Sequence, residues 1–384
     1  MNRFLSIDVL RGVIMIIMAL DHVIGAFAVH PDSEISFSNA MFAGYTSEIQ
    51  RWSRLLTHLC APGFQLFAGM GLAISVSRAQ QNGVSEGKIT NDLMNRAFVL
   101  ILADFVLMLP VFRIPLFFMV LACIGSCTFC FVFLRWLPRH VIGLLGLAII
   151  LAAPFYRGDV LLRPGTLPEL TSTSFLIDIW TQVGFGKNAL GILYPILPWL
   201  GIFAIGWWIG LYFASKTNEQ TPDHSALWFC IGGIVLIATG IVLRMMDWRV
   251  AEGIPLAGAT LFQPSFWQFT KYPPSWVFIA LTLGVLLSLL GVLRALLDRT
   301  DKTPLWASFV TVYGRTALFY FIIHFYLIGI LAIQMNIADE RDPSKKFSFG
   351  MAYLIWLGVL ALMWPLCFVY DKLRQRYRTV LRYF

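Results

Sequence analysis

Four ionisable side chains interrupt the first hydrophobic segment of the chain, residues 6–28: Asp8, Arg11, Asp21 and His22. Such groups are costly inside a bilayer, so a helix that carries them normally turns them toward a protein interior or a water-filled cavity. Eleven positions separate Arg11 from His22. On a helix this is three turns plus about 20°, so both lie on one face, about 16 Å apart along the axis. Asp8 falls within about 60° of the same line. This polar line predicts chemistry or transport across a membrane.

The composition of the 384 residues is that of a membrane protein, since 58% are hydrophobic and 13% are charged. Soluble domains average about 25% charged residues, and here apolar windows long enough to cross a bilayer recur along the chain. A transmembrane β-barrel would show short alternating segments instead. We expect an all-α, polytopic transmembrane helical bundle, formed as a single membrane-embedded domain over residues 1–384, with no soluble domain. The net charge of +8 lies largely in connections and at the chain end, so we expect no nucleic-acid partner.

About ten transmembrane helices of roughly 20 residues are predicted from these windows. Their approximate ranges are residues 6–28, 55–77, 96–112, 115–135, 140–156, 193–215, 226–246, 274–296, 308–334 and 350–371. An even number of spans places both termini on one side of the membrane. The positive-inside rule makes that side the cytoplasm, because basic residues crowd the chain end: Lys372, Arg374, Arg376, Arg378 and Arg382. We expect an integral protein of a bacterial inner membrane with cytoplasmic N- and C-termini.

In this orientation the outer connections are long, over residues 30–54, 157–192, 247–272 and 337–348. Long ordered loops are often functional. These connections hold several aromatic residues: Trp52, Trp180, Trp248, Phe262, Phe266 and Trp267. An interfacial aromatic belt explains some of them. Stacking on a carbohydrate-like acceptor is the functional alternative.

Two histidines are the candidate catalytic bases, because a neutral imidazole can take a proton at pH 7 and later return it. His22 lies about two-thirds of the way along the first span, and His58 opens the second span at its outer end. One helix rises and the next descends, so the two rings can meet at one depth. Asp21, the third catalytic candidate, cannot face His22 on the same helix but can act on a neighbouring helix. In the alternative interpretation, each histidine only forms a hydrogen bond between packed helices.

Near the inner end, Arg11 is the candidate for binding an anionic donor through its planar guanidinium. An ion pair with Asp8, three residues earlier, is the alternative. In the ninth span, Arg315 and His324 are nine positions apart and therefore point about 180° apart, unless Gly314 breaks the helix. We assign Arg11, Asp8 and Arg315 to donor binding and His324 to acceptor binding.

Three further residues are candidates for acceptor binding. Asp104 lies in the middle of the third span, where a carboxyl group needs a partner. Lys271 and Tyr272 lie at the outer mouth and can bind acceptor hydroxyls. In the alternative interpretation, residues 271–275 are chiefly a helix start, because proline is favoured at that position.

The sequence contains no phosphate-binding loop, dinucleotide fingerprint or metalloprotease motif. Cys123, Cys127 and Cys130 share a helix face, but no histidine or acid accompanies them, so a packing stripe is favoured over a metal site. All six cysteines fall in hydrophobic segments, which argues against a disulfide framework. We expect no metal.

Several blocks spread over nearly the whole chain carry a family resemblance. They are residues 6–12 (Ser-Ile-Asp-Val-Leu-Arg-Gly) with Met15, Met18, Asp21 and His22; residues 57–62 with Phe64, Phe67, Ala68 and Gly69; residues 194–201; residues 270–275; and Gly314 and Arg315 with His324. Together they resemble the heparan-α-glucosaminide N-acetyltransferase-like integral membrane proteins, a family with bacterial members. The Arg11–His22 spacing is also similar to the arginine–histidine signature of the wider membrane acyltransferase group.

The resemblance implies a ten-helix core that takes an acyl group from cytoplasmic acyl-CoA and passes it to a sugar on the far side of the membrane. It matches Arg11 to the family arginine and His22 to the histidine of the wider group. The lysosomal members of the family instead carry their catalytic histidine in the adjoining luminal region.

The leading hypothesis is an acetyl-CoA-dependent N- or O-acyltransferase. Its donor substrate is acetyl-CoA or another acyl-CoA, its acceptor is an amino sugar or glycan, and the lipid bilayer surrounds it. His22 or His58 either deprotonates the acceptor or briefly carries the acyl group. The alternative is a multi-pass transporter or exporter of a small or glycan-type substrate, with the polar line as its path. A non-catalytic membrane partner is a third class. The oligomeric state stays open, a homodimer included.

Overall fold

The computed structural model describes residues 4–28, 48–112, 114–153, 175–181, 184–186, 190–216, 224–246, 258, 260–267, 269–272, 274–298, 303–337 and 346–377. This part of the chain is mainly helical, which confirms the all-α, polytopic fold class. Its helices are α1 (Leu5–Phe27), α3 (Glu48–Thr57), α4 (Cys60–Gln81), α5 (Glu86–Leu102), the π-helical turn η1 (Ala103–Leu107), α6 (Leu109–Phe112), α7 (Val120–Leu134), α8 (Arg139–Ala152), α10 (Phe175–Thr181), α11 (Ile196–Lys216), α12 (Ser225–Met245), the 3₁₀ helix η3 (Pro264–Trp267), α14 (Trp276–Leu297), α15 (Leu305–Arg315), α16 (Ala317–Gln334) and α17 (Phe349–Arg376).

Eight helical segments of the described chain are long and apolar enough to cross a membrane. They are Leu5–Phe27, Arg51–Gln81, Glu86–Phe112, Ile196–Ser215, Ser225–Met245, Trp276–Leu297, Ala317–Gln334 and Phe349–Arg376. Two shorter apolar helices, α7 and α8, overlap the expected spans 115–135 and 140–156. Each expected span therefore corresponds to at least one helix, and the protein is an integral membrane helical bundle.

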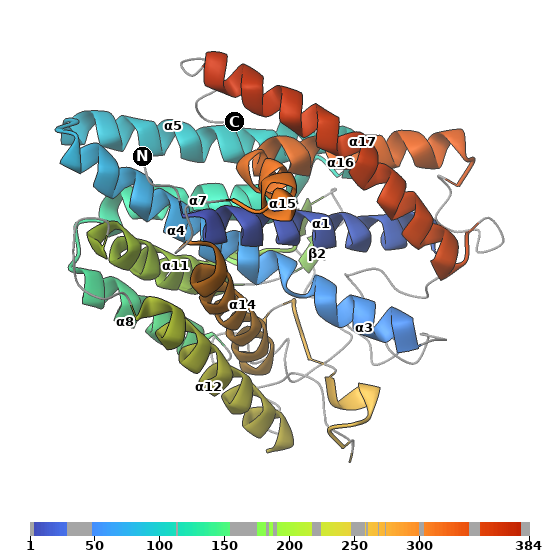
Figure 1. Ribbon diagram of the computed structural model, residues 1–384, viewed down its shortest axis with the longest axis horizontal. Coiled ribbons are helices and arrows are strands. Elements are labelled where there is room, and N and C mark those ends of the chain that lie inside the picture. Colours follow the sequence, from blue (N-terminus) through green and yellow to red (C-terminus); the bar gives the residue numbers. More distant parts are fainter. Residues whose placement is uncertain are drawn as a thin grey trace.

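Helix α1 lies at the centre of this bundle (Figure 1). It packs against α3, α4, α14, α15, α16 and α17, which come from both ends of the chain. Elsewhere α11 packs against α4 and α8, α12 packs along α14, and α5 packs along α7. The buried residues of α1 fall on more than one face of the helix, as expected for a helix surrounded by protein. A central position keeps the ionisable groups of α1 away from lipid.

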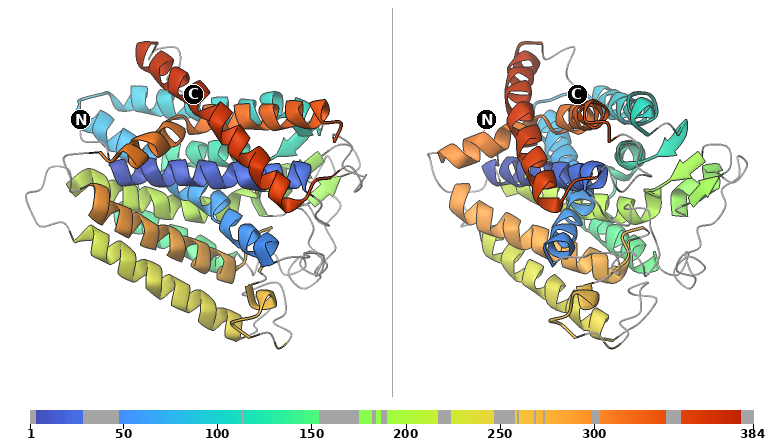
Figure 2. Two further views of the ribbon diagram at one scale, coloured as in Figure 1. Left: turned by 45° about the vertical axis from the view of Figure 1, so that its right-hand side comes forward. Right: turned by 90° about the vertical axis from the view of Figure 1, so that its right-hand side faces the viewer.

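Helices α1 and α17 run in opposite directions (Figure 2). Asp8, in the first turn of α1, and Asp371, near the end of α17, both pair with Arg315. Ala28, just after α1, forms a β-bridge with Phe347, just before α17. The first turn of α1 and the last turns of α17 therefore lie at one end of the bundle, which we name the terminal end. The opposite end, with Ala28 and Phe347, is the far end.

The expected span 55–77 consists of two helices, α3 and α4, and His58 lies in the turn between them. His58 therefore lies at the start of α4, close to the position expected for it at the opening of the second span, although α3 precedes it. Pro62 supplies the physical reason for the break between the two helices. It has no N–H to donate to the carbonyl of His58, and its ring would clash with that carbonyl in a continuous helix.

The expected span 308–334 is also two helices, α15 and α16, which meet at Thr316. The hydroxyl of Thr316 donates to the carbonyl of Val312 at 2.8 Å, while its backbone N–H reaches the carbonyl of Tyr313. A side chain that bonds to the carbonyl of the preceding turn competes with the helical ladder. The break separates Arg315 from His324, so the 180° estimate for one straight helix does not apply.

The predicted third and fourth spans meet at the far end through irregular structure. The third span continues from α5 through η1 and α6, and the fourth begins with a strand, β1 (Leu116–Phe118), before α7. This strand pairs in parallel with β3 (Leu190–Ile192), which pairs antiparallel with β2 (Gly184–Gly186). This small sheet was not predicted from the sequence, because three-residue strands carry almost no periodicity.

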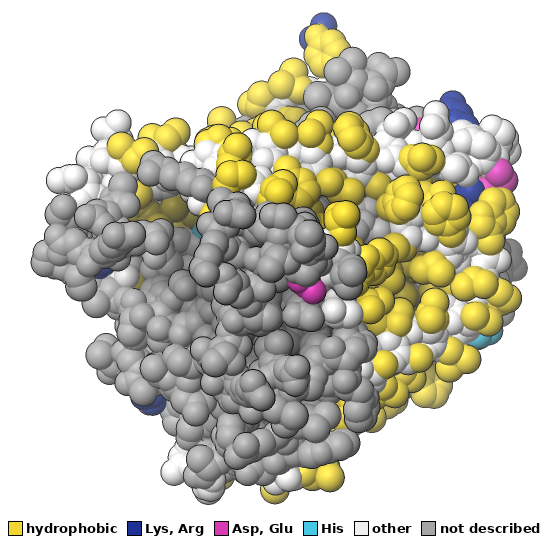
Figure 3. All heavy atoms as spheres, turned by 180° about the vertical axis from the view of Figure 1, so that it is seen from behind, with side chains coloured by type: hydrophobic (Ala, Val, Ile, Leu, Met, Phe, Trp, Pro, Cys, Tyr) yellow, Lys and Arg dark blue, Asp and Glu magenta, His cyan; other side chains and the backbone are white. Residues whose placement is uncertain are grey.

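Much of the described surface is hydrophobic. Figure 3 shows hydrophobic side chains over a wide area of one face, with few charged atoms among them. Helix α12 contributes large exposed side chains: Leu227, Trp228, Ile231, Ile234, Val235, Val242 and Met245. A surface of this kind fits the hydrocarbon of a bilayer.

Helices α1 and α15 approach closely at two glycines. A Cβ added to Gly12 would lie 2.2 Å from the carbonyl oxygen of Val310, and one added to Gly314 would lie 2.0 Å from that of Asp8. Small residues are favoured where membrane helices pack backbone to backbone. These glycines bring Arg315, the next residue, close to Asp8.

Gly314→Ala is expected to lower the unfolding temperature, because overpacking of this kind costs about 1–3 kcal/mol. Gly329→Ala in α16 is the matched control, since nothing lies within 4 Å of its added carbon, and a helical alanine gains about 0.5–1 kcal/mol over glycine. Thermal unfolding in detergent measures both variants. Equal unfolding temperatures would contradict the close approach.

Candidate functional site

The imidazole of His22 in α1 contacts the imidazole of His324 in α16. The two rings share a hydrogen bond of 2.8 Å between Nδ1 of His22 and Nε2 of His324, and their centroids are 5.0 Å apart. His324 is fully buried, whereas His22 is half-buried. Both residues were candidates on sequence alone, but their contact was not predicted. The only signal was that His324 lies well inside a span.

A second hydrogen bond determines which nitrogens carry protons. Nδ1 of His324 lies 2.8 Å from the backbone carbonyl of Tyr320. A carbonyl oxygen only accepts, so Nδ1 of His324 must donate, and its Nε2 accepts in the neutral ring. His22 therefore donates from Nδ1. In a neutral His22, the remaining nitrogen, Nε2, carries the basic lone pair.

Aromatic side chains surround the histidine pair. The ring of Phe325 lies 4.1 Å from that of His22 and 4.5 Å from that of His324, measured between centroids. Phe112 in α6 lies 5.4 Å from Phe325 and also 5.4 Å from Phe117 in β1. The irregular segment between α5 and α7 thus contributes to the surroundings of His22. Such packing lowers the local polarity and strengthens the electrostatic contacts of the pair.

Asp21, the neighbour of His22 in sequence, forms an ion pair with Arg54 in α3. Nη1 of Arg54 lies 2.7 Å from Oδ1 of Asp21, and both side chains are largely shielded from solvent. Asp21 therefore binds a side chain of a neighbouring helix, as expected from the sequence. The ion pair ties α3 to the far half of α1.

His58 lies in an aromatic cluster at the start of α4. Its ring is 5.6 Å from Phe269 and 5.5 Å from Phe278, and only 2% of the residue is exposed. The expected meeting of His58 with His22 stays a prediction.

The aromatic cluster extends to Tyr272. Phe278 lies 6.4 Å from Trp199, Trp199 lies 5.2 Å from Tyr194, and the hydroxyls of Tyr194 and Tyr272 are 2.7 Å apart. Lys271 places its Nζ 4.9 Å from the ring centre of Tyr272, and both residues are buried. The expected helix start after this motif is confirmed, because α14 begins at Trp276. The structure thus connects His58, Lys271 and Tyr272 through packed rings.

The aromatic residues of the outer connections differ in exposure. Phe262 is 93% exposed and Trp52 is 53% exposed, whereas Phe266 is buried. Trp267 is half-buried and donates its indole N–H to the carbonyl of Leu261 at 3.1 Å. Trp248 and most of the four long connections lie outside the described residues.

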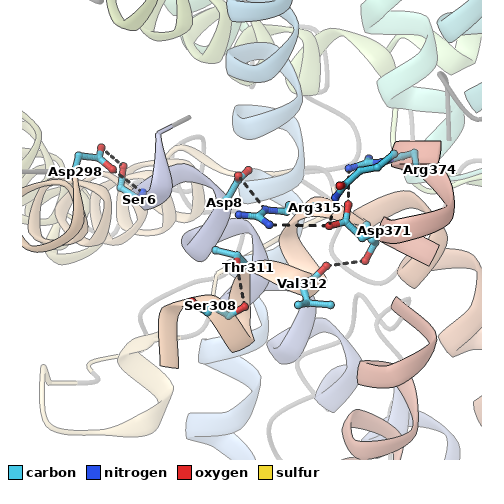
Figure 4. Close-up of polar contacts among 11 residues, drawn as sticks. Ser6, Asp8, Asp298, Ser308, Thr311, Val312, Arg315, Asp371 and Arg374 are labelled. Carbon is cyan, nitrogen blue, oxygen red and sulfur yellow. Dashed lines mark hydrogen bonds and ion pairs between the residues drawn. The ribbon is translucent and has the colours of Figure 1, made fainter. Parts of the chain in front are cut away.

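At the terminal end, Arg315 lies between two carboxylates (Figure 4). Its Nε is 3.7 Å from Oδ2 of Asp8, and its Nη1 is 4.0 Å from Oδ2 of Asp371. Asp371 also accepts from Arg374 at 3.1 Å and from Gln375 at 3.2 Å. Asp8 is thus paired across helices with Arg315. Asp371 was not among the residues predicted from the sequence, although this acid occupies the last position of the predicted tenth span.

Arginines also gather at this end. Arg96 in α5 lies within electrostatic range of Arg11 in α1 and of Arg374 in α17. With Arg315 included, four arginines from four helices lie at this end, together with the carboxylates of Asp8 and Asp371. A group of like charges held partly out of water favours binding of an anion. The sequence analysis proposed Arg11 and Arg315 for this task but not Arg96.

Asp104 holds the start of α7. Its Oδ2 accepts hydrogen bonds from the backbone N–H groups of Met119, at 2.8 Å, and Ala122, at 3.0 Å. The first N–H groups of a helix have no partner within the helix, and a carboxylate also interacts favourably with the helix dipole. This contact supplies the partner that an intramembrane acid requires. The residue lies in η1, the π-helical turn, which places the carboxyl group toward α7.

Asp104→Leu is expected to lower the free energy of unfolding by about 1–3 kcal/mol, because two buried N–H groups lose their acceptor. Asp104→Asn retains an acceptor oxygen and is expected to stay close to the parent protein. Thermal unfolding compares the two variants. If the Asp104→Asn protein is fully stable but binds the acceptor substrate more weakly, this carboxylate has a substrate-binding role instead.

Residues 3–236 match the family described as heparan-alpha-glucosaminide N-acetyltransferase, catalytic. The match includes Arg11, His22 and His58, and it ends before Arg315 and His324. No curated protein is significantly similar to the chain. The family match covers more than half of the sequence and agrees with the polytopic helical fold, so the chain belongs to the heparan-alpha-glucosaminide N-acetyltransferase family of membrane transferases.

Proposed function

We propose that this protein transfers an acyl group, such as acetyl, from a cytoplasmic acyl-CoA to an amino sugar or glycan acceptor on the other side of the membrane. The observation that carries the proposal is the chemical contrast between the two ends of α1. One end joins a group of arginines, and the other holds a hydrogen-bonded pair of imidazoles. The terminal end is assigned to the cytoplasm on the basic residues of the chain end.

The arginine group suits the donor. Acyl-CoA carries phosphates at one end and its thioester at the other, joined by a long flexible arm. Arg11 and Arg96 lie where the phosphates of a donor entering from the cytoplasm would arrive. Guanidinium groups bind phosphate oxygens in a bidentate manner. The thioester would then extend along α1 toward His22.

The histidine pair suits the transfer step. Nε2 of His22 takes a proton from the acceptor amine or hydroxyl as that group attacks the thioester carbon. A C–N or C–O bond forms, the C–S bond breaks, and the thiolate of coenzyme A leaves. His22 then returns the proton to the thiolate sulfur. Direct transfer of this kind needs no acyl-enzyme intermediate and balances one proton per turnover.

The acceptor would approach from the far end. Lys271 and Tyr272, with His58, form a polar and aromatic cluster that suits sugar hydroxyls and ring faces. Aromatic residues with high exposure, Phe262 and Trp52, offer further stacking surfaces. The acceptor would meet the acyl group at the level of His22.

Acyl transfer by the purified protein tests this proposal. Detergent-purified protein is incubated with labelled acetyl-CoA and a panel of amino sugars and glycan precursors, and labelled product is measured. His22→Ala is expected to lower turnover by about 10²–10⁴-fold, the usual contribution of a general base. The same change in His58 tests the second candidate. Substrate flux into proteoliposomes without covalent change would refute transfer and favour an exporter.

Arg11→Lys is expected to weaken acyl-CoA binding, because lysine keeps the charge but loses the planar pair of donors. A loss of about 1.5–3 kcal/mol in binding free energy is the usual size for a hydrogen bond to a charged group. Arg51→Lys, at the exposed Arg51–Glu48 pair of α3, is the matched control. Titration with a non-hydrolysable acyl-CoA analogue measures both. Unchanged affinity in the Arg11 variant would remove Arg11 from the donor site.

A further inference from the structure

We infer that His324 is a positioning residue for His22: it holds His22 in the tautomer with a proton on Nδ1, so that Nε2 is the nitrogen that exchanges protons with the acceptor. The inference deepens the proposed function and rests on it. The family match ends at residue 236 and therefore assigns nothing to His324.

The orientation of His324 is set within its own helix. Its Nδ1–H donates to the carbonyl of Tyr320, one turn earlier in α16, at 2.8 Å. The ring of Tyr320 also stacks on that of His324, with centroids 5.3 Å apart and planes 18° apart. Rotation of the imidazole by 180° would bring a carbon toward the carbonyl and lose the hydrogen bond. The acceptor nitrogen, Nε2, is therefore directed toward α1.

Aromatic packing holds the imidazole of His22 against that of His324. Phe325 contacts both imidazoles, and Phe321 lies 5.9 Å from His324 in a T-shaped arrangement. His324 has no exposed surface, so water does not compete for its Nε2. A buried acceptor without a donor would be destabilising. The Nδ1–H of His22 supplies this donor, which links the tautomer of one ring to that of the other.

The arrangement parallels the orienting carboxylate that accepts from the Nδ1–H of a catalytic histidine, but here the orienting group is neutral. When His22 takes a proton on Nε2, its Nδ1–H remains bonded to Nε2 of His324, and the bond becomes charge-assisted. The positive charge is thereby stabilised without a second titrating acid. The proton leaves again through Nε2 of His22 to the thiolate sulfur, and the bond between the rings persists.

The tautomers can be read in the parent protein, so the first test needs no variant. The protein is labelled with ¹⁵N-histidine and placed in lipid vesicles for solid-state NMR. The expected result is an N–H···N coupling between two histidine rings, with the accepting ring protonated on Nδ1. His324→Gln identifies the signals, because it removes one partner. Protonation of His324 on Nε2 would overturn the inference.

Kinetics supply the second test. His324→Phe keeps an aromatic ring but has no acceptor, whereas His324→Gln offers an amide oxygen to the Nδ1–H of His22. We expect the kcat of the Phe variant to fall about 10²-fold below that of the parent, with the KM for acyl-CoA within about twofold. The kcat of the Gln variant is expected to be at least about tenfold higher than that of the Phe variant. His140→Phe, at an exposed position in α8, is the matched control. A purely structural role would not separate Phe from Gln in kcat while leaving KM unchanged.

These measurements distinguish failure of the proposed function from failure of the positioning role. A parent protein that transfers no acyl group with any acceptor refutes the proposed function, while the NMR signature still decides the tautomer. Transfer in the parent together with parent-like kcat in His324→Phe overturns the positioning role alone. Equal loss in the Phe and Gln variants also overturns it. If the Phe variant does not fold, the NMR measurement on the parent decides.

Discussion

The ionisable side chains of α1 must be kept out of lipid, and much of the bundle is arranged to meet this requirement. Arg315 is placed beside Asp8 by glycines that let α15 approach α1. Arg54 neutralises Asp21 from α3, and His324 accepts from His22. Helices α15, α3 and α16 thus supply one partner each. The cost of an unpaired ionisable group in a membrane explains why α1 is central rather than peripheral.

The partners differ in kind between the two ends of α1. At the terminal end they are ionic, and the arginines outnumber the nearby carboxylates, which favours an anionic ligand. Further along the helix an ion pair joins Asp21 to Arg54, whereas His22 pairs with a second imidazole among aromatic rings. In the proposed function, the charged end of α1 binds the phosphates of acyl-CoA and the imidazole of His22 acts at its thioester. The physical basis of the proposed activity is that phosphate binding and proton transfer occur at different ends of α1.

Breaks in the helices place several of the polar groups. Pro62 prevents α3 and α4 from forming one helix, so His58 lies in a turn against Phe269 and Phe278. Thr316 separates α15 from α16 through a hydroxyl bond to the preceding turn. The π-helical turn η1 directs Asp104 to the start of α7. In each case a local change in the hydrogen-bond ladder turns a side chain toward a partner that a regular helix would not offer.

The sequence by itself determined the fold class, the position of most spans, and the polar face of the first helix, because these follow from local hydropathy and helical periodicity. It also identified His22, Arg11 and His324 as candidates. Only the tertiary structure decided that His22 pairs with His324, that Asp8 pairs with Arg315, and that Arg96 joins Arg11. Such pairings depend on how helices far apart in the chain rotate and cross, and on breaks such as Thr316. The period of a single helix contains no information about its neighbours.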